Sequence, residues 1–125
     1  MSYIKHKSDE SMEDYLEAIL LLKKEKGNVR SIDIAEKLEF TKASVSIAMK
    51  SLREKGFISV GENGSIALTD KGLERAEMVL ERHTIIAECL ISLGVNSDVA
   101  HEDACRIEHD ISEETFNAIK KHVKK

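Results

Sequence analysis

The sequence predicts a mainly helical protein that contains one short two-stranded hairpin. Two observations point to helices: the 125-residue chain has no proline, and its apolar residues recur at helical spacing in six segments. A third observation is that two short alternating runs flank a cluster of turn-forming residues. Apolar residues make up 42% of the chain, which is enough for one compact domain or two small ones that share a core.

The first three predicted helices follow one another closely, and the second is short. The first covers residues 8–26, and Gly27 follows it at the position where glycine often ends a helix. The second covers residues 31–38. Thr41 is expected to cap the third, which reaches residue 55 and buries a face that repeats at helical spacing. That face consists of Val45, Ala48, Met49 and Leu52.

The hairpin and three more helices follow. Residues 57–60 and 65–68 alternate as strands do, and the four residues between them are turn formers. Further helices are expected at about 69–93, 98–110 and 113–123. Three helices followed by a hairpin make a winged helix-turn-helix, which we assign to residues 1–70. Residues 71–125 form a helical segment that we expect to bury its apolar face against a second copy of the chain.

The exposed face of the third helix is suited to double-stranded DNA. Small residues let a helix enter the major groove, hydroxyl groups bond to phosphates or bases, lysines neutralise phosphates, and an exposed isoleucine can contact a thymine methyl group. The alternative is a small helical domain with no nucleic-acid role. The order of elements favours DNA binding, and the predicted contact residues are Thr41, Lys42, Ala43, Ser44, Ser46, Ile47 and Lys50.

Composition narrows the choice of partner and compartment. Aromatic residues make up only 4% of the chain, which argues against proteins that stack the bases of single strands. Residues 1–60 contain 11 basic and 10 acidic residues, whereas residues 61–125 contain 8 and 13. The acidic half is consistent with cation binding or with an ordinary solvated surface. No signal peptide or membrane-spanning run is recognisable, so we expect a cytoplasmic protein with reduced cysteines.

Potential metal ligands share faces on the predicted helices. Asp14 and Glu17 are three residues apart, while Cys105, Glu108 and His109 stand at i, i+3 and i+4. Carboxylates, imidazoles and one thiolate together suit divalent first-row metals, whereas structural zinc sites more often use several cysteines. Each residue also has an ordinary alternative as a solvated acid, a small core residue or a surface histidine. His83 and His101 are further candidates.

Six segments spread along nearly the whole chain carry a further signal: 11–19, 33–38, 41–49, 68–72, 81–83 and 102–109. In sequence and in order these segments resemble the diphtheria toxin repressor family of iron- and manganese-dependent repressors. The resemblance implies a winged-helix domain joined to a helical metal-binding and dimerisation domain. It also implies a homodimer that binds palindromic operators when loaded with metal and represses genes of metal uptake. In length the chain resembles the manganese transport regulator branch.

The resemblance also implies a ligand set, in which features of two branches are combined. Asp14 and Glu17 match ligands of the manganese branch, and Cys105 matches a ligand of the iron branch. His83, Glu108 and His109 match ligands of both branches. His101 matches an ancillary ligand of the iron branch, but Ala87 stands where that site has an acidic residue. The oxygen ligands favour Mn(II) and the thiolate favours Fe(II) or Zn(II), with two ions per chain compatible with the charge.

Two other classes of function are alternatives to a metal-dependent repressor. An enzyme is rejected because the sequence has no glycine-rich cradle or loop that would form a substrate pocket, and every candidate ligand is predicted on a helix. The runner-up is a metal-independent winged-helix regulator that senses a small molecule, or thiol oxidation through Cys105. The prediction is therefore a dimeric, Mn(II)- or Fe(II)-dependent repressor that binds double-stranded operator DNA.

Overall fold

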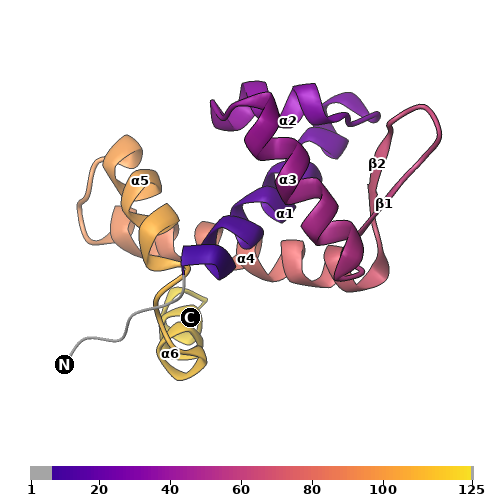
Figure 1. Ribbon diagram of the computed structural model, residues 1–125. Helices are drawn as coiled ribbons and strands as arrows, with labels where there is room; N and C mark the ends of the chain where they lie inside the picture. Colours follow the sequence, from indigo (N-terminus) through magenta and orange to yellow (C-terminus); the bar gives the residue numbers. More distant parts are fainter. Residues whose placement is uncertain (1–6, 125) are drawn as a thin grey trace. The chain divides into compact units, whose positions relative to one another are not determined.

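The computed structural model describes the backbone of residues 7–124 and the side chains of residues 12–124. In that part of the chain six helices and one two-stranded sheet follow one another in the predicted order (Figure 1). They are α1 (Lys7–Lys26), α2 (Ser31–Leu38), α3 (Lys42–Glu54), β1 (Ile58–Val60), β2 (Ile66–Leu68), α4 (Asp70–Ser92), α5 (Ser97–Ile107) and α6 (Glu113–Val123). None of the described helices is both long and apolar enough to cross a bilayer.

The chain divides into two compact units. Residues Ser8–Glu77 form the N-terminal unit, and Met78–Lys125 belong to the C-terminal unit. The division falls inside α4, so the first part of this helix belongs to one unit and the remainder to the other. Each unit has its own buried apolar residues, and each is described separately below.

The core of the N-terminal unit is formed by the inner faces of three helices and the sheet. Leu16 and Ile19 of α1, Ile34 of α2 and Val45 of α3 are almost completely inaccessible to solvent. The apolar spacing that predicted these helices therefore marks the faces that pack together. Tyr15 completes this core and contacts Phe40 edge to face, with ring centroids 5.7 Å apart.

The wing is an antiparallel hairpin in which Ile58 pairs with Leu68 and Val60 with Ile66. It is anchored to the link between α1 and α2, because the Ile66 N–H donates to the Val29 carbonyl at 2.8 Å. The Ser65 hydroxyl also donates to the Asn28 side-chain oxygen at 2.6 Å. These bonds hold the turn end of the wing to the link between α1 and α2.

The first turn of α4 is joined closely to the residue before β1. The Thr69 N–H donates to the Phe57 carbonyl at 3.0 Å, and the Thr69 hydroxyl donates to the Gly56 carbonyl at 2.7 Å. A Cβ atom at Gly72 would lie 2.0 Å from the Phe57 carbonyl oxygen. Only glycine fits there, so residue 72 determines how closely α4 approaches the wing.

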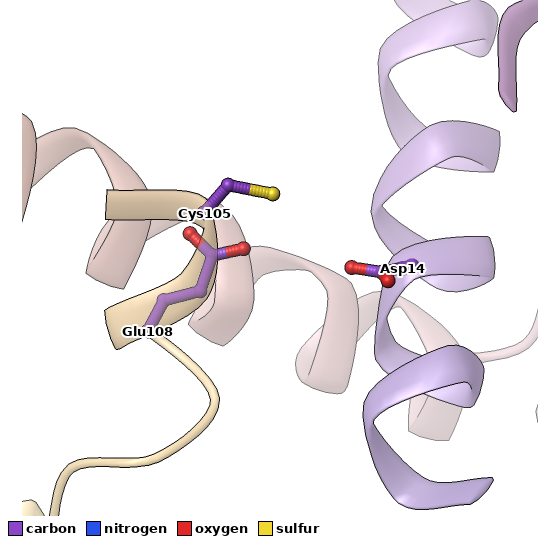
Figure 2. Close-up of side chains that lie close together, drawn as sticks. All are labelled: Asp14, Cys105 and Glu108. Carbon is purple, nitrogen blue, oxygen red and sulfur yellow. The ribbon is translucent and has the colours of Figure 1, made fainter. Parts of the chain in front are cut away.

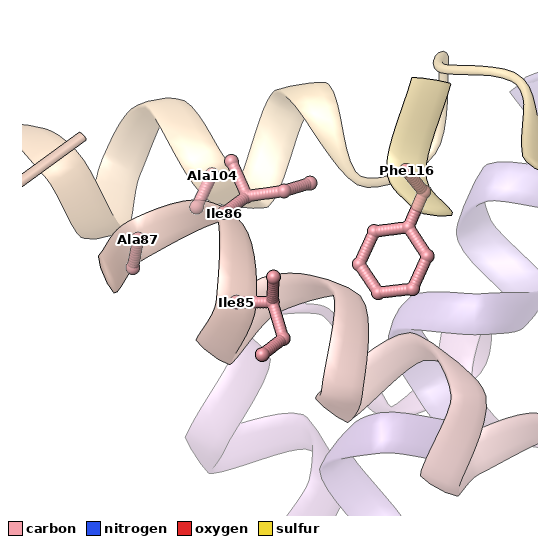
Figure 3. Packing of buried hydrophobic residues seen from close by; sticks show 5 residues of the cluster. All are labelled: Ile85, Ile86, Ala87, Ala104 and Phe116. Carbon is pink, nitrogen blue, oxygen red and sulfur yellow. The ribbon is translucent and has the colours of Figure 1, made fainter. Parts of the chain in front are cut away.

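The C-terminal unit has a smaller core, which α4, α5 and α6 share (Figure 3). Ile85, Ile86 and Ala87 of α4 pack with Ala104 of α5 and Phe116 of α6. Asn96 and Ser112 cap α5 and α6 with their side-chain oxygens. Helix α5 ends at Ile107, three residues earlier than the sequence pattern predicted, and this early end affects the candidate metal ligands.

Candidate DNA-binding surface and metal centre

The predicted DNA-contacting residues lie on the solvent-exposed side of α3 and its N-cap. Thr41 begins the helix: its hydroxyl oxygen accepts a hydrogen bond from the Ser44 N–H at 3.1 Å. The opposite face is buried through Val45, Met49 and Leu52. All seven predicted residues are exposed, and Ile47 is 73% exposed although it is apolar. The prediction assigns this side chain to contact with a thymine methyl group.

A concave surface lies between α3 and the wing. It is lined by Ser31 at the start of α2, by Lys50 and Arg53 on α3, and by Val60 and Ile66 of the wing, among others. Lys50 was predicted from the sequence, whereas Ser31 and Arg53 were not. Ser31 and Arg53 line this concave surface because the wing lies beside α3, and helical periodicity alone does not show where the wing lies.

Two candidate ligands of the N-terminal unit project from α1. Asp14 and Glu17 are both partly buried and stand one turn apart, as their spacing predicted. The neighbouring Glu13 is buried and forms an ion pair with Arg75 of α4, at 3.2 Å between Nη1 and Oε2. Burial, followed by the Asp14 carboxylate, raises the pKa of Tyr15. This part of α1 is therefore rich in negative charge.

The C-terminal unit supplies the other four predicted ligands. His83 lies on α4 and Cys105 on the last turn of α5, while Glu108 and His109 follow directly after α5. Figure 2 shows Cys105 and Glu108 extending from the end of α5, and Asp14 extending from α1. Glu108 and His109 are only 2% and 3% exposed, whereas Cys105 is exposed. The sequence thus indicated the positions, but not that two of these residues lie beyond the helix.

Glu108 is the meeting point of these side chains. His83 Nδ1 lies 2.9 Å from its Oε2 atom, and His109 Nε2 lies 3.4 Å from its Oε1 atom. His101 stacks on His83, with His101 Nδ1 3.1 Å from His83 Nε2. A buried carboxylate is costly unless positive charge or hydrogen bonds compensate it. One carboxylate with two imidazoles and a nearby thiol is also a donor set that divalent transition metals accept, so the residues present fit such an ion.

Sequence reasoning missed Arg82, which precedes His83 on α4. Its Nη1 atom donates to the carbonyls of Glu108 and Ile111, at 3.2 and 3.1 Å. The residue was noted only as part of the segment 81–83 that resembles the family. No local pattern links it to carbonyl groups some 26 residues later in the chain.

Both units of the chain match profiles of a known protein family. Residues 8–65 match the family profile described as iron dependent repressor, N-terminal DNA binding domain. Residues 69–125 match the profile described as iron dependent repressor, metal binding and dimerisation domain. The chain belongs to the iron-dependent repressor family. Members of this family are metal-dependent transcriptional regulators, so the resemblance inferred from the sequence is confirmed.

Individual relatives support the same assignment. An uncharacterized HTH-type transcriptional regulator of Methanocaldococcus jannaschii is 34% identical, over 89% of this chain and 90% of its own length. The transcriptional regulator MntR of Escherichia coli is 35% identical, over 89% of this chain and 72% of its own length. A solved manganese-dependent transcriptional repressor in complex with manganese matches 90% of the chain with a TM-score of 0.83 and 25% identity. The present chain spans about half the length of that solved protein.

Proposed function

We propose that this member of the family is a repressor that binds palindromic operator DNA as a homodimer when loaded with Mn(II) or Fe(II), and so controls genes of metal uptake. The observation that carries the proposal is the donor set around Glu108, a buried carboxylate with His83 and His109 beside it. The similar manganese-dependent transcriptional repressor supports manganese as the activator. We further propose a cytoplasmic location and no catalytic activity.

The proposed ligands are Asp14, Glu17, His83, Cys105, Glu108 and His109. The carboxylates and the thiolate among them carry enough negative charge for two dications that share one carboxylate. A bound dication supplies the positive charge that these carboxylates and the thiolate require. Asp14 and Glu17 belong to the N-terminal unit and the other four to the C-terminal unit. Ligands contributed by both units couple metal binding to the placement of the DNA-reading helix.

In the same proposal, residues 1–70 read DNA and residues 71–125 bind metal and form the dimer. Thr41, Lys42, Ala43, Ser44, Ser46, Ile47 and Lys50 face the operator. A twofold dimer presents two copies of α3, and the two half-sites of such an operator are centred about 34 Å apart, one turn of B-DNA. Metal needs to favour the DNA-competent arrangement by only about 1–3 kcal/mol to change operator affinity by one or two orders of magnitude.

The test is operator binding under metal control. A palindromic duplex is first selected from a random pool by the Mn(II)-loaded protein, and its binding is then followed by fluorescence anisotropy. We expect at least a tenfold increase in affinity with Mn(II), or with Fe(II) under anaerobic conditions, and reversal by a chelator. Equal affinity in the chelated and metal-loaded protein would overturn the proposal and favour a metal-independent regulator.

A further inference from the structure

We propose that Arg82 is a positioning residue for the metal centre, because it holds the short segment that carries Glu108 and His109. The inference rests on the proposed function, in which these two residues are ligands. It adds a residue that is not itself a ligand but on which the geometry of two ligands depends.

The segment after α5 lacks the regular support of a helix. Helix α5 ends at Ile107, and the last carbonyl groups of any helix have no partner within it. Beyond Ile107, the Glu108 N–H donates to the Ala104 carbonyl and the Asp110 N–H donates to the Ile107 carbonyl. The amides of the segment are thus partly held by α5, whereas the carbonyls of Glu108 and Ile111 are held from outside that helix.

Arg82 provides those contacts. Its Nη1 atom donates to the Glu108 carbonyl at 3.2 Å and to the Ile111 carbonyl at 3.1 Å. Its guanidinium carbon lies over the Phe116 ring, 5.2 Å from the ring centroid, in a cation–π contact. One guanidinium thus fastens both ends of the segment 108–111 to α4 and stacks on α6.

His83, the next residue on α4, contacts the other end of the same glutamate. Its Nδ1 atom lies 2.9 Å from the Glu108 carboxylate, whereas Arg82 binds the Glu108 main-chain carbonyl. Two consecutive residues of α4 therefore hold both the backbone and the side chain of Glu108. Groups that orient ligands in this way commonly change metal affinity by about 10- to 100-fold when they are removed.

Charge and geometry predict opposite effects, and this makes the proposal testable. A cation near a dication site repels the metal, so its removal should strengthen metal binding if charge alone matters. If Arg82 acts by positioning, its removal should weaken binding. Arg106 on α5 is exposed and makes a matched control for the loss of one arginine charge in the same unit.

The experiment compares Arg82→Gln, Arg82→Lys and Arg106→Gln with the wild-type protein, without DNA. Mn(II) dissociation constants are measured by competition with a chromophoric chelator, and Co(II) absorption reports coordination geometry. We expect Arg82→Gln to weaken Mn(II) binding about tenfold and to change the Co(II) spectrum. Arg82→Lys, which can still reach one carbonyl, should recover part of the affinity, and Arg106→Gln should bind as the wild type does.

Several outcomes would overturn the inference. One is an Arg82→Gln variant that binds Mn(II) as tightly as the wild type, or more tightly, and has an unchanged Co(II) spectrum. If Arg82→Gln fails to fold, the same result in Arg82→Lys would overturn the inference. A weakening of equal size in Arg106→Gln would also contradict it. These results differ from a failure of the proposed function, in which the wild-type protein itself shows no specific binding of metal.

Discussion

Glu108 is buried, and two imidazole rings lie beside its carboxyl group. Burying an acidic group is costly unless hydrogen bonds or positive charge compensate for it. The two imidazoles supply such partners, and in the proposed function a bound cation supplies positive charge. At the residue scale, the proposed metal response therefore depends most on Glu108 and the adjacent His109.

Replacing either of these residues should separate folding from metal sensing. We expect Glu108→Ala and His109→Ala to remain folded and to lose metal-stimulated operator binding, because each change removes a proposed ligand and not merely a supporting group. The loss in metal affinity should exceed the roughly tenfold effect expected for Arg82→Gln. Circular dichroism checks the fold, and anisotropy with increasing Mn(II) checks the response. A variant with an unchanged activation midpoint would contradict the assignment.

Cys105 is the residue expected to determine which metals activate the protein. Thiolates favour softer ions and carboxylates favour Mn(II). We expect Cys105→Glu to keep activation by Mn(II) and to lose the response to Fe(II) and Zn(II). The measurement is operator affinity titrated with each metal under anaerobic conditions, with Cys89→Ser as the control. Activation of the wild type by Fe(II) and not by Mn(II) would show that Cys105 outweighs Asp14 and Glu17.

At the residue scale, the family resemblance predicted the proposed ligands, and the structure showed which other residues hold them in place. Spacing alone placed Cys105, Glu108 and His109 on one face, but each had an ordinary alternative. Arg82 could not be predicted, because its importance arises from two main-chain carbonyls. Such carbonyls need a partner only where a helix ends, and a sequence shows the end of a helix poorly.

At the scale of elements, α3 separates a buried face from an exposed one, and the exposed face carries the proposed DNA contacts. Lys42 and Lys50 are the lysines on that face. We expect Lys42→Ala to weaken binding to all DNA sequences and to reduce the slope of log affinity against log salt by about one. Ile47→Ala should instead change sequence preference. An unchanged affinity and salt slope in Lys42→Ala would remove α3 from the interface.

Helix α2 offers a test of stability against pH. The Asp33 carboxylate accepts from the Arg30 N–H at 2.9 Å and also pairs with Lys26. The hydrogen bond from Lys26, followed by that from Arg30, lowers the pKa of Asp33 below its usual value. Because the pKa of Asp33 is lower in the folded state than in the unfolded chain, the ionised carboxylate stabilises the fold. This stabilisation is fully present above the pKa of Asp33 in the unfolded chain and is lost as the pH falls through its pKa in the folded state.

The Asp33→Asn variant should therefore be less stable than the wild type at neutral pH, and the difference should shrink as the solution becomes strongly acidic. Urea unfolding across the acid range measures both free energies. Glu36→Gln, at an exposed position of the same helix, serves as a control for loss of a carboxylate. A difference that stays constant across that range would show that Asp33 has no such role.

The order and type of every described element followed from the sequence, since each helix has a regular apolar face and each strand alternates. The predicted helix over 98–110 was too long. Helix periodicity continues through Glu108 and His109 because both are buried, but burial here comes from their place in a turn. Periodicity records which residues are inside and not whether the backbone is still helical.

At the scale of the whole molecule, assembly follows from exposed apolar surface. In the C-terminal unit, Leu93 is 72% exposed, and Met78, Ile91 and Val99 are each exposed by 40% or more. We expect these residues to contribute to a twofold dimer, as the dimerisation profile of the family indicates. Sedimentation should show twice the mass of one chain at micromolar concentration. Leu93→Glu should shift the protein toward monomers, whereas a wild-type monomer with and without metal would contradict this expectation.

The close packing of Phe57 against Gly72 limits how a signal can act on DNA binding. The Phe57 carbonyl leaves no room for any side chain at this position, and Thr69 is bonded to the same segment. The residues that lead into the wing are consequently fastened to the start of α4. We expect any signal that acts on DNA binding to move these two parts together, because moving the wing away from α4 would break the contact that Gly72 permits.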